Sequence, residues 1–294
     1  MKTYFRNRVC PECRHGHDPI LSACPNCGKE NPEGKQFAHL LPFGAPTQIV
    51  FLVVCLFGLQ ILGLIASLIA MGVYGGMHPG ATPEEFSEFL SGPIANFAVT
   101  GSVYVLIAGI MLLIVGLQKR FKPMLSSFAG WKPYVAGLVG FVACFLINWL
   151  YSAGASAIME AAGLGEIGVN ENETIVRSVA RAVPVGSIIV LGLVGPFCEE
   201  MAYRVGMFGF LRRLGKPLAY VLSAIVFGFI HFGWNALVSG DPALIVNEFV
   251  NIPIYIGSGA ALCFLYDRFG FAASYTCHVL NNVVSLLLTM FINQ

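Results

Sequence analysis

Seven long stretches of this chain contain no aspartate, glutamate, lysine or arginine. They cover residues 49–74, 89–118, 133–159, 182–198, 217–240, 249–266 and 269–294. A helix that crosses the hydrocarbon core of a bilayer needs roughly 20 apolar residues. We therefore predict seven spans, near residues 49–73, 94–117, 133–155, 182–204, 217–238, 249–267 and 272–292.

The composition supports a membrane protein. Hydrophobic residues make up 56% of the chain and charged residues 11%, whereas a soluble domain typically carries about 25% charged residues. Apolar and polar residues do not alternate with a period of two, so a barrel is not expected. Helices satisfy their own backbone hydrogen bonds in lipid. The predicted fold is therefore an all-α polytopic membrane protein.

The basic residues predict the orientation. If the N-terminus is cytoplasmic, six basic residues precede the first span on the inner side, and only Arg177 and Arg181 fall outside. The inner loops then hold Lys119, Arg120, Lys122, Lys132, Arg212, Arg213, Lys216 and Arg268. Seven spans leave the C-terminus outside. The net charge of +1 indicates no particular partner, and no nucleic acid is expected.

Four cysteines lie ahead of the first span. Cys10 and Cys13 form one C-x2-C pair, and Cys24 and Cys27 form a second. Two such pairs can place four thiolates around one tetrahedral Zn²⁺, so we predict a structural zinc ribbon whose metal supplies its folding energy. Two disulfides are the alternative, which a reducing cytoplasm disfavours.

These features divide the chain into a cytoplasmic zinc ribbon (1–39), a linker (40–47) and a transmembrane helical domain (48–294). The ribbon could bind a protein partner, regulate the protein or act as a stable cap. Residues 156–181 read as a polar outer loop that could contain a short helix.

Ionisable side chains inside membrane spans are rare and usually functional. Here they gather in the C-terminal half, at Glu199, Glu200, Arg204, His231 and His278, and the seventh span also carries Asn282. The first three spans carry no ionisable residue. We therefore expect spans four to seven to build a site, with the first three as packing or as a gate.

Helical spacing separates the two glutamates. Glu200 and Arg204 are four residues apart on one helix face and can form an ion pair. Glu199 lies about 100° around the helix. Glu200 thus gains a structural partner, and Glu199 is left available as a base.

The histidines suggest hydrolysis. His278 and Asn282 are also four residues apart and could converge on one atom, while Phe227 lies one turn before His231 and could fix its rotamer. A carboxylate, two imidazoles and an amide can activate water and stabilise an oxyanion. The same residues could instead have structural roles. Glu200 and Arg204 could form a buried ion pair, and the other polar side chains could only hold helices together.

These residues form a recognisable set of motifs. Residues 199–204, EEMAYR, resemble the EExxxR motif of the CAAX-protease and bacteriocin-processing family of intramembrane endopeptidases, which includes type II prenyl-protein proteases. Residues 227–231, FGFIH, look like its FxxxH motif, and residues 278–282, HVLNN, match its HxxxN motif. The similarity covers roughly residues 130–294, which would be the catalytic core.

The resemblance implies a helical membrane fold with a catalytic pocket open to the cytosolic side. It implies that Glu199 with His231 activates water, and that His278 and Asn282 stabilise the oxyanion. Glu200 and Arg204 would then shape the site. Family members are often labelled metalloproteases, but no H-E-x-x-H motif occurs here, so we favour a catalytic site without metal.

The predicted function is hydrolysis of a peptide bond in a membrane-associated protein or peptide, by CAAX-type or related processing. Two alternatives stay open. A proton- or cation-coupled transporter would show proton flux that survives Glu199→Gln. A non-catalytic scaffold with a partner-binding ribbon would lose only thermal stability in that variant. One difficulty concerns depth, because His231 lies roughly 20 Å inside its predicted span.

Overall fold

A computed structural model of the chain describes residues 4–163 and 167–292. Within them, six helices are long and apolar enough to cross a membrane. They are α1 (Ala45–Met77), α3 (Pro93–Leu117), α5 (Lys132–Ala161), the helix Pro184–Arg212, α12 (Pro242–Phe269) and α13 (Phe271–Phe291). The all-α membrane fold is confirmed. Parts of the predicted domains and outer loop (1–3, 164–166, 293–294) lie outside the described residues.

The fifth predicted span differs from the structure. It forms a shorter apolar helix, α10 (Lys216–Phe229), followed by a turn and by α11 (Trp234–Ser239). The stretch without Asp, Glu, Lys or Arg runs on to residue 240 and does not mark this break. The main-chain N–H of Gly233 donates to the Glu248 carboxylate at 2.8 Å, so it is not used to extend α10.

The fourth span is longer than predicted and is not a uniform α-helix. It consists of α7 (Pro184–Ile189), η2 (Val190–Val194), α8 (Gly195–Glu199), η3 (Glu200–Phe208) and α9 (Gly209–Arg212), in which η2 and η3 are π-helical. Glu199 therefore lies thirteen residues, or about 20 Å, from the end of α9. His231 lies at a similar distance from the start of α10. Both residues therefore lie at a similar depth in the bundle, which accounts for the large depth expected for His231.

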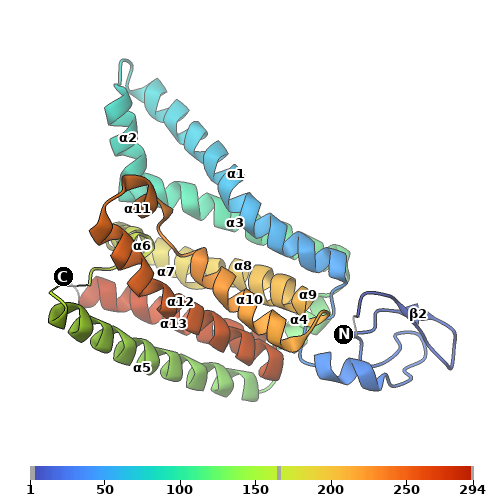
Figure 1. The fold of residues 1–294 in the computed structure, drawn as a ribbon. Helices are drawn as coiled ribbons and strands as arrows, with labels where there is room; N and C mark the ends of the chain where they lie inside the picture. The colour runs from blue at the N-terminus through green and yellow to red at the C-terminus, as the bar shows by residue number, and fades with distance from the viewer. Residues whose placement is uncertain (1–3, 164–166, 293–294) are drawn as a thin grey trace.

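The helices pack in pairs around the long fourth span. α1 and α3 are joined through α2 (Pro83–Ser91) and form the upper pair in Figure 1, while α5 lies against α13 and α10 against α12. Large apolar side chains on the outer faces are exposed, including Leu64 on α1 and Ile147 on α5. Lipid would cover such side chains.

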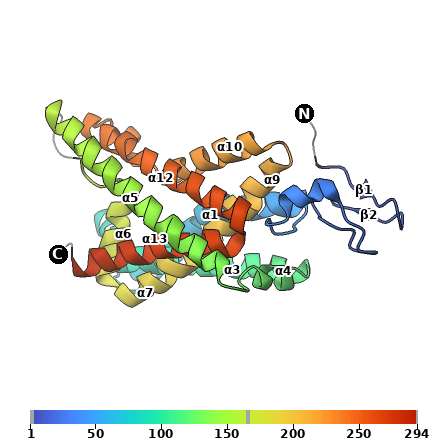
Figure 2. The ribbon, with the colours of Figure 1, turned by 90° about the horizontal axis from the view of Figure 1, so that it is seen from below.

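The N-terminal module lies beyond one end of the bundle (Figures 1 and 2). It holds the short antiparallel strands β1 (Arg8–Val9) and β2 (Gly16–His17) and the 3₁₀-helix η1 (Pro32–Phe37). The turn between α9 and α10 lies at the same end, as does α4 (Phe121–Ser126).

Arg213 docks the module onto the bundle. This side chain is 1% exposed and directly follows α9. Its five N–H groups donate to Asp18 Oδ1 (2.9 Å), Asp18 Oδ2 (2.8 Å), the Tyr4 carbonyl (2.8 Å), the Phe43 carbonyl (3.0 Å) and Gln48 Oε1 (2.9 Å). One guanidinium therefore connects the ribbon, the linker and α1.

The short helix anticipated in the outer loop is present as α6 (Glu171–Ala182), at the end of the bundle opposite the ribbon (Figure 1). The basic residues predicted for the inner loops lie at the ribbon end, because they occur at or just beyond the ends of α3, α9 and α12 and at the starts of α5 and α10, whereas Arg177 and Arg181 of α6 lie at the opposite end. That this end is cytoplasmic stays a prediction.

Candidate active site

The two adjacent glutamates have different surroundings. Glu200 is fully buried, whereas Glu199 is 8% exposed and lines a cavity of about 530 Å³. Both belong to the fourth span, at the junction of α8 and η3. Only Glu199 is therefore placed to meet a molecule in the cavity.

Glu200 is held on all sides. Its Oε2 lies 3.4 Å from Arg204 Nε, as the helical spacing predicts, and also accepts a hydrogen bond from the Ser274 hydroxyl. Its Oε1 lies 2.9 Å from His278 Nδ1. The Arg204 guanidinium also packs over the Phe227 ring, 4.3 Å from the centroid, a favourable cation–π geometry.

His278 bridges the two glutamates. Its Nδ1 faces Glu200, and its Nε2 lies 3.6 Å from Glu199 Oε2. An ionised Glu200 can only accept, so Nδ1 carries a proton.

His231 approaches Glu199 from the other side. Its Nδ1 is 2.8 Å from the Phe227 carbonyl, which can only accept, so this nitrogen carries a proton and Nε2 points into the site. The Nε2 atom is 4.0 Å from Glu199 Oε2. The ring packs against Phe227 (centroids 4.9 Å apart), as the motif predicts, and stacks on Tyr255 (4.6 Å).

Asn282 lines the same cavity, but its amide is partly engaged. Its Nδ2 donates to the Leu191 carbonyl at 2.9 Å. In a π-helical turn this carbonyl would accept from the residue five positions later, which is Pro196 and has no N–H. Pro196 therefore leaves an acceptor for Asn282. The second N–H of the amide stays available.

Sequence reasoning missed two polar side chains of this site. The Tyr104 hydroxyl, from α3, donates to Glu199 Oε1 at 3.2 Å, so one of the first three spans does contribute to the site. A lone tyrosine in an apolar span carries no signal. Ser274 could have been found, because it precedes His278 by four residues on α13.

The candidate residues lie between two cavities. The first extends between apolar side chains of α1, such as Leu59, and of α10, such as Phe229. The second, of about 400 Å³, lies among α5, α12 and α13. His231, His278 and Asn282 line both, so a molecule at these residues has space on two sides.

The first cavity reaches toward the end of the bundle opposite the ribbon. Its polar lining includes Asn172 and Glu173 of α6, together with Trp234 of α11. These elements lie at the end opposite the ribbon (Figure 1). If the ribbon end is cytoplasmic, this part of the cavity is nearer the outer side.

Comparison with known proteins gives a matching family. Residues 181–284 match the family described as type II CAAX prenyl endopeptidase Rce1-like. The resemblance drawn from the three motifs is confirmed. The Rce1-like region contains all six candidate side chains of the membrane site.

A relative of the chain is the Bacillus subtilis (strain 168) protein named "Putative membrane peptidase YdiL". It is 28% identical over 159 residues, which cover 53% of this chain and 58% of that protein. The match thus spans a little over half the length of this relative. No solved structure gives a significant match.

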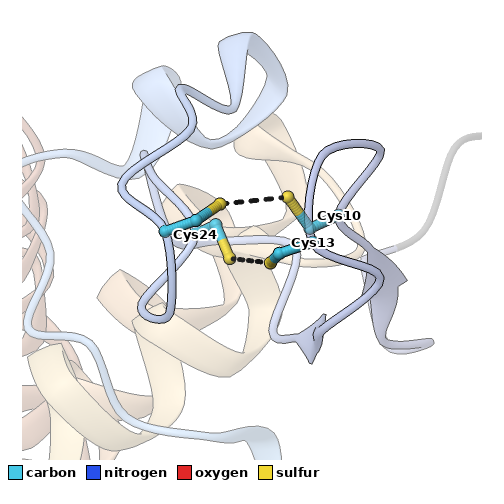
Figure 3. Close-up of side chains that lie close together, drawn as sticks. Cys10, Cys13 and Cys24 are labelled. Carbon is cyan, nitrogen blue, oxygen red and sulfur yellow. Dashed lines mark hydrogen bonds between the residues drawn. The ribbon is translucent and has the colours of Figure 1, made fainter.

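Outside the Rce1-like region, the four cysteines of the ribbon gather as predicted. Their sulfur atoms all lie within 4.8 Å of one another. The Sγ atoms of Cys10 and Cys27, and those of Cys13 and Cys24, are 3.6 Å apart (Figure 3). Tetrahedral Zn²⁺ with Zn–S bonds of about 2.3 Å requires sulfurs about 3.8 Å apart, so the four thiols fit a zinc ion.

The surroundings also favour the thiolate form of one of the four cysteines, Cys13. Hydrogen bonds from the Asn26 side chain and the His15 main chain lower the pKa of Cys13 to about 6. Because the thiolate is the metal-binding form, Cys13 is prepared for a cation at neutral pH.

Elemental analysis should find about one zinc per purified chain. The double variant Cys10→Ser/Cys24→Ser should lose it, because two ligands cannot hold a structural zinc site. Cys144→Ser, which changes a buried cysteine of α5, should retain it. Zinc that persists in the double variant would place a metal elsewhere in the protein.

Proposed function

We propose that this chain is an intramembrane endopeptidase in which Glu199 activates a water molecule. The observation that carries the proposal is the placement of Glu199 Oε2. Glu199 lines the first cavity, and its Oε2 is buried with no hydrogen-bond partner among the described residues, 3.6 Å from His278 Nε2 and 4.0 Å from His231 Nε2. These separations exceed a direct hydrogen bond and suit a bridging water.

Glu199 would act as the general base. Tyr104 donates to one carboxylate oxygen and leaves the other, Oε2, without a hydrogen-bond partner among the described residues. His231, protonated at Nδ1, presents the Nε2 lone pair to the same water and orients it. Proton removal by a positioned carboxylate typically contributes about 10²–10⁴-fold to a rate.

The reaction then proceeds by addition and elimination. The water oxygen bonds to the scissile carbonyl carbon while its proton moves to Glu199. We assign a proton to both ring nitrogens of His278 in this step, so that its Nε2–H and the free amide N–H of Asn282 stabilise the oxyanion. When the C–N bond breaks, Glu199 returns its proton to the amine nitrogen.

Glu200 and Arg204 would hold this geometry without touching the substrate. Glu200 fixes the orientation of the His278 ring through Nδ1. We assign no step to a metal in the membrane site. The predicted structural zinc would be bound by the cysteines of the ribbon.

The proposed substrate is a membrane-associated protein or peptide, which the enzyme would cleave in CAAX-type or related processing. The family supports a peptidase at the membrane. The apolar walls of α1 and α10 suit a lipid or apolar side chain, and the second cavity leaves room for polypeptide beyond the scissile bond. A protein partner of the ribbon stays a separate prediction.

The test is cleavage of quenched-fluorescence peptides by purified protein in liposomes, with prenylated and unprenylated versions of each sequence. Wild type should cleave, and His231→Ala should lower kcat/KM about a hundredfold or more, because the water loses its second contact.

His78→Ala is the matched control. His78 also bonds a carbonyl four residues earlier through Nδ1 (Tyr74, 3.1 Å) and stacks on a tyrosine, but at the exposed end of α1. It should cleave like wild type. Full activity in His231→Ala would reject the assignment, and proton flux without cleavage would indicate a transporter.

A further inference from the structure

His231 is held only in part by its own helix, where its Nδ1 contacts the Phe227 carbonyl and its main-chain N–H donates to the Gly228 carbonyl. It lies two residues beyond the last residue of α10, in the turn that leads to α11. Its ring must nevertheless stay within reach of Glu199. The contacts that hold this turn therefore decide whether the proposed base and its partner meet.

Glu248 of α12 is the central contact of the turn. It is 3% exposed. Its Oε2 accepts from the Gly233 main-chain N–H at 2.8 Å, and its Oε1 accepts from the Glu171 main-chain N–H at 2.7 Å. Glu171 is the first residue of α6, so the carboxylate also meets the positive end of a helix dipole.

The same α6 terminus holds His231 directly. The Asn170 side chain donates to the His231 carbonyl at 3.0 Å. Its Oδ1 caps α6 by accepting from Glu173 N and also accepts from the Tyr255 hydroxyl (3.3 Å). Tyr255, seven residues after Glu248 on α12, stacks on the imidazole. The main chain and the ring of His231 are thus held by one connected group.

The packing at Gly233 shows how closely these parts fit. A Cβ at this position would lie 2.7 Å from Glu171 Cβ and 2.8 Å from Glu248 Oε1. Real Cβ atoms do not approach other atoms so closely. Residue 233 is therefore glycine because Glu248 and α6 press against the turn.

We infer that Glu248 is a positioning residue of the proposed peptidase, which fixes the His231 turn to α6 and α12 so that the imidazole faces Glu199. The inference rests on the proposed function. Glu248 does not line either cavity, so it acts through His231 and not on the substrate.

Glu248→Gln tests the inference with little change in shape. A glutamine keeps one acceptor but presents an N–H₂ group to the second main-chain N–H. The turn then shifts, and a displacement of about 1 Å can cost about a hundredfold in rate. We expect kcat to fall about 10- to 100-fold with KM within about twofold.

Asn247→Ala is the matched control. Asn247 is the neighbouring residue of α12 and donates to the Val169 carbonyl at 2.9 Å, so it joins α12 to the same segment without touching the turn. It should keep the wild-type kcat. Asn170→Asp is a second variant, which keeps the cap of α6 but removes the donor to His231. Its kcat should fall as much as that of Glu248→Gln.

A double-mutant cycle separates positioning from general weakening of the fold. In a His231→Ala background, Glu248→Gln should change the remaining rate by less than about twofold, because its effect passes through His231. A full 10- to 100-fold loss in that background, or no loss in the wild-type background, would overturn the inference.

Hydrogen exchange gives a readout that does not need activity. A peptide spanning residues 230–240 should exchange faster in Glu248→Gln than in wild type or Asn247→Ala. Unchanged exchange would overturn the inference even if wild type cleaves. If wild type cleaves nothing, the proposed function fails, while the exchange result still decides whether Glu248 holds the turn.

Discussion

Replacing Glu199 with glutamine is expected to lower kcat about a thousandfold and to leave the melting temperature within about 2 °C of wild type. An amide of the same shape cannot take a proton from water, so the base is lost. The Tyr104 hydroxyl can still donate to the remaining carbonyl oxygen. Steady-state cleavage and thermal melting in the same detergent check both parts.

Glu84→Gln is the control for the removal of a carboxylate, because Glu84 is exposed on α2. It should cleave like wild type. Retention of more than about a tenth of the wild-type kcat in Glu199→Gln would show that another group activates the nucleophile.

The second large effect is a loss of stability, which we expect when the neighbouring Glu200 is replaced. Glu200→Gln leaves the Arg204 guanidinium without a counter-charge, although both side chains are fully buried. Breaking a buried ion pair from one side typically costs about 3–5 kcal/mol. We expect a large fall in the melting temperature, with the loss of activity following the loss of folded protein.

The charge argument can be tested by removing the cation as well. Glu200→Gln/Arg204→Met has no unpaired guanidinium, so it should melt above Glu200→Gln alone. Equal melting temperatures for Glu199→Gln and Glu200→Gln would contradict the division of the two glutamates into a reactive and a structural group.

Much of the membrane site could be predicted because polar residues are conspicuous in apolar spans. Glu200 and Arg204 are four residues apart, and even across the π-helical turn that spacing brings them together. The spacing of Cys10, Cys13, Cys24 and Cys27 was equally informative, since metal ligands impose narrow geometry.

The rest depended on tertiary contacts that leave no local pattern. Tyr104 is one aromatic residue in an apolar span, and only the packing of α3 against α8 brings it to Glu199. The end of α10 was not predicted, because the stretch without Asp, Glu, Lys or Arg continues past Phe229 to residue 240. It depends on Glu248, nineteen positions further along the chain.

Arg213 could be predicted only as one more basic residue of an inner loop, yet it has a consequence for the whole chain. Because all five of its donors are used by the ribbon, the linker and α1, no other soluble module can replace the ribbon unless it offers the same set of oxygen atoms. A related bundle that has no such module should therefore carry a different residue here, or an arginine that reaches into solvent.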